Sequence, residues 1–245
     1  MYKNNRILAV ITARGGSQRL PKKNIMPLAG KPLIAWSISS AKKSRYLDKI
    51  IVSSDCDNIV DVAKSYGAEV PFKRPKSLAT STASGIDPVK HAVEFLQNIG
   101  ENFDVVVLLQ PTSPFRTAKD IDNAIELLID NFNNNVQSVV SFVEPDKKIN
   151  WHYYFDSANH NKVVNISANK QNSIKRVENT TAYCLNGAVY VIKCEVLMTK
   201  ECSSFISENT IGYLMDKYNS MDIDTELDFK FCEFLLQQQS SKSEG

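Results

Sequence analysis

The segment DVVVLLQ at 104–110 constrains the fold of this chain more than any other feature. It is almost entirely apolar, so a strand built from it has no polar face to turn toward water. Such continuous runs are typical of central strands in parallel sheets, which helices bury on both faces. A second apolar, β-branched run, ILAVITA at 7–13, lies near the N-terminus.

Strand-like and helical segments alternate along most of the chain. Apolar runs predict further strands at 49–53, 138–143 and 187–192. Apolar residues at helical spacing predict helices at 31–43, 58–66, 86–97, 117–132 and 225–238. This alternation predicts an α/β fold with an open, mostly parallel sheet and helices on both faces. Ligands of such sheets bind at the carboxyl ends of the strands.

Residues 145–181 interrupt this alternation. They are polar and rich in Asn and Lys, and they contain the aromatic residues Trp151, Tyr153, Tyr154 and Phe155. We interpret them as an insertion within one domain that spans 1–245. Because aromatic side chains in a polar insertion need cover, we favour an interface with another subunit over stacking on a ligand.

The bulk composition narrows the class of protein. At 245 residues, with 43% hydrophobic and 23% charged residues, the chain can bury a large core. No apolar run is long enough to span a bilayer, and no signal-peptide cleavage pattern follows the first strand, so we expect a cytoplasmic protein. Five cysteines without a CxxC pair argue against a disulfide framework or a structural zinc site.

The first strand ends in a basic loop with two glycines, RGGSQRLPKKN at 14–24. Its cations are Arg14, Arg19, Lys22 and Lys23. A strand that ends in such a loop can place backbone N–H groups and positive charges around phosphates. A solvated loop without a ligand is the alternative. The loop matches neither the dinucleotide-binding nor the P-loop pattern, so neither of these folds is supported.

Charge is distributed unevenly along the sequence. Residues 1–50 hold eleven Lys and Arg residues but one acid, Asp48, although the net charge of the whole chain is only +2. A basic N-terminal part indicates a polyanionic ligand. We do not expect a nucleic-acid partner, because the net charge is small and no nucleic-acid-binding motif is present.

Two later segments also carry candidate side chains. The turn QPTSPFRT follows the strand at 104–110, and in it Gln110 can hydrogen-bond a base or sugar while Arg116 either meets an anion or is a surface cation. Further on, Asp222 and Asp224 stand two residues apart in SMDIDTELD, so an extended backbone points both to one side. Paired carboxylates suit Mg²⁺, which usually shares its shell with substrate phosphates. As an alternative, Asp224 caps the helix that follows it.

Seven segments, taken in order, resemble the acylneuraminate cytidylyltransferases, also called CMP-N-acetylneuraminate synthetases. They are AVITARGGSQRLPKKN, GKPLIAWSI, KIIVSSD, RPKSLATSTAS, LLQPTSPFRT, NGAVYV and SMDIDTELD. The likeness covers nearly the whole chain, and the ordered set is more specific than any one segment. It implies a Rossmann-like nucleotidyltransferase domain with 145–181 as a small inserted dimerisation region, a homodimer and dependence on Mg²⁺.

The resemblance also implies a reaction. CMP passes from CTP to the anomeric hydroxyl of N-acetylneuraminate, a nine-carbon sugar acid, and pyrophosphate leaves, in the biosynthesis of cell-surface polysaccharides. The same reaction on legionaminate, pseudaminate or 3-deoxy-manno-octulosonate is an alternative. A non-catalytic nucleotide-binding protein is an alternative of another class, against which the Asp222/Asp224 pair speaks, because a binder needs no metal carboxylates.

Matching motifs assign residues to roles. The implied nucleotide contacts are Ala13, Arg14, Lys23, Asn24, Arg74 and Ser84. The implied sugar-acid contacts are Gln110 and Arg176, and the implied Mg²⁺ ligands are Asp222 and Asp224, which act in catalysis with Arg14 and Lys23. Two positions depart from the family pattern. Ser81 stands where many relatives have Asp, and Cys184-Leu185 stands where relatives often have Arg-Pro, on a strand that lies near the sugar pocket in relatives.

Overall fold

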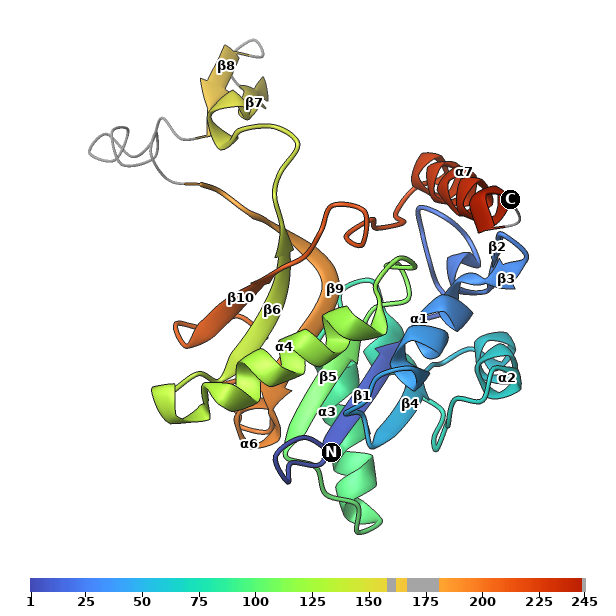
Figure 1. Ribbon diagram of the computed structural model, residues 1–245, viewed down its shortest axis with the longest axis vertical. Helices are drawn as coiled ribbons and strands as arrows, with labels where there is room; N and C mark the ends of the chain where they lie inside the picture. The colour runs from blue at the N-terminus through green and yellow to red at the C-terminus, as the bar shows by residue number, and fades with distance from the viewer. Residues whose placement is uncertain (158–161, 167–180, 244–245) are drawn as a thin grey trace.

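The computed structural model describes residues 1–157, 162–166 and 181–243. Its centre is a six-stranded sheet in the order β10-β6-β9-β5-β1-β4 (Figure 1). The strands are β1 (Ile7–Thr12), β4 (Lys49–Ser53), β5 (Val105–Leu109), β6 (Ser138–Val143), β9 (Cys184–Lys193) and β10 (Thr210–Leu214). All neighbouring pairs are parallel except those that β9 makes with β5 and β6. The predicted mostly parallel α/β sheet is therefore confirmed.

The two apolar runs are neighbours in the middle of this sheet. β1 pairs with β5 in register from Ile7 opposite Val105 to Ile11 opposite Leu109. Every residue of β5 is buried, as the continuous apolar pattern of 104–110 predicts. Because both strands run the same way, the loop after Thr12 and the turn after Leu109 meet at one edge of the sheet.

Helices cover both faces of the sheet (Figure 1). They are α1 (Leu33–Lys42), α2 (Asp57–Ser65), α3 (Asp87–Asn98), α4 (Ala118–Asp130), the short α6 (Cys194–Leu197) and α7 (Glu226–Ser243). Apolar residues of α1, α2 and α4 pack on one face, and those of α3 and α6 pack on the other. None of the helices in the described ranges is long and apolar enough to cross a membrane.

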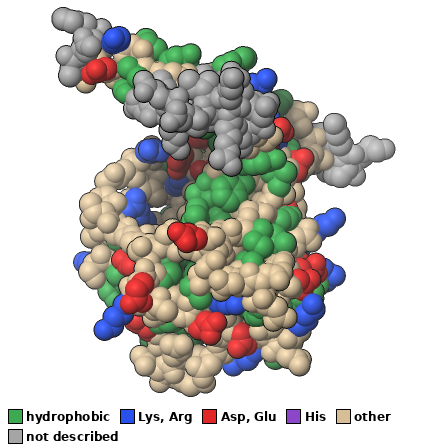
Figure 2. Space-filling model, turned by 90° about the vertical axis from the view of Figure 1, so that its left-hand side faces the viewer, with side chains coloured by type: hydrophobic (Ala, Val, Ile, Leu, Met, Phe, Trp, Pro, Cys, Tyr) green, Lys and Arg blue, Asp and Glu red, His purple; other side chains and the backbone are tan. Residues whose placement is uncertain are grey.

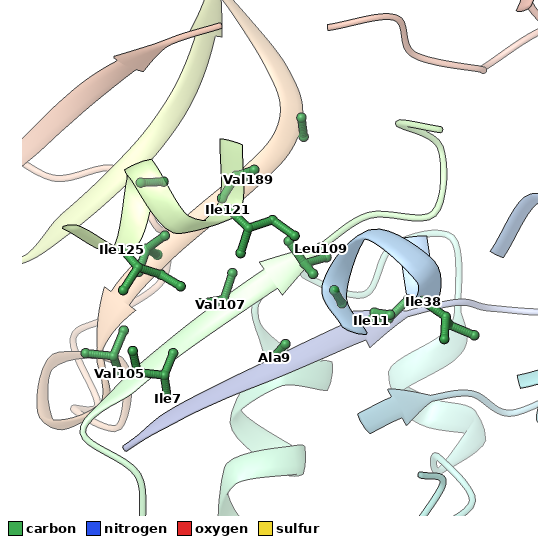
Figure 3. Packing of buried hydrophobic residues seen from close by; sticks show 14 of the residues in the cluster. Ile7, Ala9, Ile11, Ile38, Val105, Val107, Leu109, Ile121, Ile125 and Val189 are labelled. Carbon is green, nitrogen blue, oxygen red and sulfur yellow. The ribbon is translucent and has the colours of Figure 1, made fainter. Parts of the chain in front are cut away.

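Alternate residues of each central strand enter different cores. Figure 3 shows Ala9 and Val107 on the face that α1 and α4 cover, where Ile38 and Ile121 point toward the sheet. The intervening Val10 packs with the α3 side of the sheet. Each fully buried aliphatic side chain of this kind contributes about 1.5–3 kcal/mol relative to exposure.

The predicted helix start at Thr117 is also confirmed. The Thr117 hydroxyl accepts a hydrogen bond from Asp120 N at 3.2 Å, and the Asp120 carboxylate accepts one from Thr117 N at 2.9 Å. This reciprocal pair is a capping box at the start of α4. It fixes where the turn after β5 ends.

The sequence pattern did not predict β10 or the two-residue strands β2 (Pro27–Leu28) and β3 (Lys31–Pro32). β10, with the sequence TIGYL, lies at the edge of the sheet and is only partly buried. Such a strand shows no long apolar run and contains a glycine, so pairing with β6 decides its conformation rather than its own pattern. Short 3-10 turns complete the fold at Lys23–Ile25, Lys76–Ala79, Phe132–Asn134 and Ile149–Trp151.

The predicted insertion contains a separate two-stranded sheet, β7 (Tyr153–Asp156) paired with β8 (Lys162–Asn165). Figure 1 shows this hairpin projecting away from the central sheet. Its aromatic residues face solvent, and Trp151 and Phe155 are 64% and 69% exposed. Parts of the predicted insertion, 158–161 and 167–180, lie outside the described residues.

Removal of the α4 capping box tests the local argument. We expect Thr117→Ala to lower the free energy of unfolding by about 1 kcal/mol, because the amide of Asp120 loses its acceptor. Thr181→Ala, at an exposed threonine, is the matched control and should leave stability unchanged. Urea denaturation of both variants measures the difference, and equal midpoints for the two would contradict the capping role.

Candidate functional site

A cavity of about 520 Å³ opens at the carboxyl ends of β1 and β5. Seven of the ten residues that the sequence assigned to roles line it: Arg14, Lys23, Asn24, Arg74, Ser84, Gln110 and Asp224. They come from four separate segments of the chain, which the fold brings together at the edge of the sheet. Three cations and a carboxylate therefore face one cavity.

The basic loop is folded against the end of β4. Gly15 N donates a hydrogen bond to Asp55 Oδ1 at 3.0 Å, and Asn24 Nδ2 donates one to Arg14 O at 3.0 Å. A Cβ atom at Gly15 would lie 2.9 Å from Cys56 Cβ, closer than real side chains approach. Glycine is therefore required at this position by the close approach of two loops. The sequence analysis did not single out Asp55 as a partner of this loop.

Arg74 is a buried cation on the cavity wall. Its guanidinium donates from Nε to Ser53 Oγ at 3.1 Å and from Nη2 to Ser53 O. Burial lowers the pKa of Arg74 to about 10, while the charge of nearby Asp55 opposes that shift. The side chain stays cationic at neutral pH. Opposite it, Arg14 reaches over to donate a hydrogen bond to Thr80 O at 2.7 Å.

The basic loop and the acidic segment touch directly, although about two hundred positions separate them in sequence. Asp224 forms ion pairs with Arg19 at 2.9 Å and with Lys23 at 3.1 Å. The Lys23 ammonium also donates a hydrogen bond to Ile223 O at 2.6 Å. Lys23 is buried, so this contact fixes the end of the basic loop against the segment that carries Asp224.

Asp222, the other acid of this segment, lies within electrostatic reach of Asp224 and Lys23. Burial raises the pKa of Asp222, and the neighbouring Asp224 charge adds to this shift, while a hydrogen bond with Thr112 opposes it. Between the two acids, Ile223 is fully buried and donates its N–H to Thr112 O at 2.9 Å. The segment is therefore anchored to the turn after β5 by its backbone as well as by its side chains.

The alternative that Asp224 caps the last helix is wrong. The helix begins at Glu226, and Thr225 forms its capping box with Asp228: Asp228 N donates to Thr225 Oγ1 at 3.3 Å, and Thr225 N donates to Asp228 Oδ2 at 2.7 Å. Asp228 also accepts a hydrogen bond from Asp224 N at 3.1 Å. The Asp224 carboxylate is left to face Arg19 and Lys23.

Arg116 is not the surface cation considered from the sequence, since it is only 2% exposed. Its Nη1 donates hydrogen bonds to Gln110 O at 3.0 Å and Ala188 O at 2.9 Å, which tie the end of β5 to β9. Burial lowers the pKa of Arg116 to about 9. Its Nε and Nη2 have no hydrogen-bond partner among the described residues, and its predicted contact with an anion stays a prediction.

The Gln110 side chain lies against a bend in β9. Its Oε1 is 3.1 Å from the position that a Cβ atom at Gly187 would take, and Gly187 has a φ of +71°. Both the close approach and the left-handed backbone require glycine there. The NGAVYV motif therefore leaves room for Gln110 beside the cavity.

Buried polar contacts that the sequence did not indicate connect the acidic segment to the sheet and to α4. Asn186 Nδ2 donates a hydrogen bond to Ser220 Oγ at 2.9 Å, and Asn186 Oδ1 accepts one from Ser141 Oγ at 2.6 Å. Asn219 Nδ2 donates to the Asp120 carboxylate at 3.2 Å. These contacts connect β6, β9 and α4 to the residues just before Asp222.

Three predicted residues, Ala13, Asp222 and Arg176, are not among those that line the cavity. Ala13 is buried, and its N–H donates to Ser53 O at 3.0 Å, so only its backbone carbonyl remains for another contact. Arg176 lies outside the described residues. Within the described ranges, no three His, Cys, Asp or Glu side chains gather in a way that would hold a metal by themselves.

Comparison with known proteins agrees with this geometry. Residues 8–228 match the family model described as cytidylyltransferase. The chain is similar to a CMP-N,N'-diacetyllegionaminic acid synthase of Legionella pneumophila, with 40% identity over 95% of this chain and 97% of that protein. It is also similar to an N-acylneuraminate cytidylyltransferase of Escherichia coli, with 34% identity over 96% of this chain and 53% of that protein.

A solved structure agrees in fold. A CMP:2-keto-3-deoxy-manno-octonic acid synthetase complexed with CTP superposes with a TM-score of 0.70, at 16% identity over 96% of this chain and 99% of the other. At this identity the likeness supports the architecture alone. The family match, which spans both the basic loop and the acidic segment, shows that this chain belongs to the cytidylyltransferase family.

Proposed function

We propose that this enzyme transfers CMP from CTP to the anomeric hydroxyl of a nine-carbon α-keto sugar acid and releases pyrophosphate. The observation that carries the proposal is the direct approach of the basic loop and Asp224 across one cavity. A triphosphate needs cations along its length and a carboxylate-held metal at one point, and this cavity offers both. Relatives named as synthases of CMP-linked sugar acids support the acceptor class.

In this proposal different residues of the cavity contact different parts of the nucleotide. Arg14 and Lys23 neutralise the phosphates, with Asn24 beside them on the same loop, and Arg74 and Ser84 contact the cytidine side. The sugar hydroxyl attacks the α-phosphorus in line, and negative charge grows on the departing pyrophosphate. Because the reaction requires little beyond positioning and charge neutralisation, preorganised cations supply most of the acceleration.

Asp222 and Asp224 are the residues that would hold Mg²⁺. Two neighbouring carboxylates are a common protein contribution to a Mg²⁺ shell that substrate phosphates complete. The raised pKa of Asp222 reflects repulsion from Asp224 as well as burial, and a divalent cation relieves such repulsion. When bound, the ion would neutralise charge on the phosphoryl oxygens.

The acceptor and the assembly are further parts of the proposal. The candidate acceptors are the acids that the sequence indicated, which are N-acetylneuraminate, legionaminate, pseudaminate and 3-deoxy-manno-octulosonate, and Gln110 and Arg176 are the proposed sugar-acid contacts. The exposed aromatic residues of the predicted insertion, Trp151 before β7 and Phe155 within it among them, supply the apolar surface expected of a homodimer interface.

A pyrophosphate-release assay tests the reaction. Purified enzyme is incubated with Mg²⁺, each of the four sugar acids in turn and CTP, ATP, GTP or UTP. We expect release with CTP and at least one nine-carbon acid, and little with the other nucleotides. No release with any acid would overturn the proposed function.

Substitutions at the two ends of the phosphate chain should abolish turnover without unfolding the protein. We expect Arg14→Ala and Asp222→Asn each to lower kcat by about 10²–10³-fold, because each removes one charge that stabilises the transition state. Lys200→Ala and Asp61→Asn, at exposed positions, are the matched charge controls. Near-normal kcat in either site variant, with a normal melting temperature, would contradict the assigned roles.

The contact between Arg19 and Asp224 makes a separate prediction about cation binding. Because Arg19 competes with a metal for the Asp224 carboxylate, Arg19→Ala should bind Mn²⁺, a spectroscopic substitute for Mg²⁺, more tightly in the absence of nucleotide. An exposed ion pair is worth at most about 1 kcal/mol, so the gain should be roughly 2–5-fold. Electron paramagnetic resonance measures free Mn²⁺. Lys22→Ala makes the same change in net charge, and an equal gain there would show that only the overall charge matters.

A further inference from the structure

The half of the sheet formed by β9, β6 and β10 extends past the end of β5, and we call this part the wall. β5 ends at Leu109, which lies opposite Val189 of β9. β9 begins five residues before Val189, and this part pairs with β6 alone, with Leu185 opposite Phe142. Figure 1 shows β6 and β9 continuing beyond the end of β5. The wall therefore stands beside the turn that carries Gln110.

One face of this wall carries Tyr190 and Phe142. Tyr190 lies opposite Val140, and two residues further along β6 Phe142 lies opposite both Leu185 and Leu214. Side chains of register partners share a face, as do residues two apart in one strand. These three residues, Phe142, Leu185 and Leu214, form what we call the Leu185 face.

Tyr190 lies close to Gln110, which lines the cavity. Its hydroxyl is 3.9 Å from the position of a Cβ atom at Gly187, the same position that Gln110 Oε1 approaches at 3.1 Å. Burial raises the pKa of Tyr190, and the charge of Asp222 adds to the shift. The Leu185 face therefore begins beside the residues placed nearest to the reacting groups.

The Leu185 face is apolar and open. Leu185 is 48% exposed and Leu214 is 55% exposed. The Phe142 ring is partly buried and lies close to β10, since a Cβ atom at Gly212 would come within 3.3 Å of it. Figure 2, viewed from the side of the molecule where β10 lies, shows hydrophobic side chains gathered on this side.

We propose that the Leu185 face binds the end of the sugar acid remote from its carboxylate, and that it selects an acid whose distal substituents are acylamino and methyl groups. This inference rests on the proposed function and narrows its acceptor. Leu185 lies two residues from Gly187, which is about 7 Å along an extended strand, so a nine-carbon chain held at Gln110 reaches it.

The selection follows from desolvation. A distal hydroxyl placed on Leu185 and Leu214 would lose water without gaining a hydrogen-bond partner, whereas methyl groups of acyl substituents bury apolar area there. N,N'-diacetyllegionaminate carries a second acetamido group and a terminal methyl group in place of two hydroxyl groups of N-acetylneuraminate. The two acids therefore differ in the part of the molecule that would lie on this face.

A second copy of the chain is the rival occupant of the same surface. We favour the sugar acid because the Leu185 face is continuous with Tyr190 and Gln110, whereas the most exposed aromatic residues, at 151–155, lie on the separate β7–β8 hairpin. If a second copy covered the face, changing Leu185 would alter assembly and leave the choice of acid unchanged.

The test is the ratio of kcat/KM for N,N'-diacetyllegionaminate to that for N-acetylneuraminate. We expect this ratio to exceed one in the unmodified enzyme and to fall at least about 10-fold in Leu185→Asn, since small apolar groups in such pockets are worth 10–200-fold. Leu214→Asn should lower it in the same direction. Ile99→Asn, at an apolar residue 56% exposed beyond the end of α3, is the control and should leave the ratio unchanged.

Light scattering and thermal melting accompany each kinetic measurement. An unchanged ratio in both Leu185→Asn and Leu214→Asn, or a preference for N-acetylneuraminate in the unmodified enzyme, would overturn the inference and leave the proposed function standing. Loss of the dimer mass in Leu185→Asn with an unchanged ratio would likewise overturn it in favour of a subunit interface. If one variant fails to fold, the ratio of kcat/KM values measured in the other variant tests the inference. Absence of turnover with every acid would instead overturn the proposed function itself.

Discussion

Burial of β1 and β5 on both faces is the constraint on which the rest of this structure depends. Neither strand has a polar face, so helices must cover the sheet from both sides, and the chain must cross over the sheet after each parallel strand. Parallel neighbours then end at one edge. That edge carries the basic loop after β1 and the turn that begins at Gln110.

Three buried cations near this edge of the sheet have different surroundings. Arg74 and Arg116 are both buried cations whose pKa values burial lowers, but Arg74 lines the cavity, whereas Arg116 donates to backbone carbonyls of two strands. Lys23 has a third kind of environment, because a buried ammonium there meets the carboxylate of Asp224. Buried cations thus line the cavity, join two strands and anchor a loop, and only their neighbours distinguish these positions.

The antiparallel strand β9 lies beside both the turn that carries Gln110 and the acidic segment. It enters between β5 and β6, and its bend at Gly187 makes room for Gln110. Above the bend it extends past β5 and presents Leu185, while Asn186 holds the acidic segment through Ser220. One strand therefore connects the turn after β5, the carboxylates and the apolar wall beside them.

The sequence by itself determined the central strands, the helices on both faces, the start of α4 at Thr117 and seven of the residues that line the cavity. These follow from short-range patterns, since a buried strand, an amphipathic helix and a capping box each depend on residues within a few positions of one another. Only the tertiary structure decided that Arg116 is buried between strands, that Thr225 rather than Asp224 caps the last helix, that β10 pairs at the edge, and that Asp224 meets Arg19 and Lys23. The physical reason is that burial and pairing of these groups depend on partners which the packing of the sheet, and not their sequence neighbourhood, brings within reach.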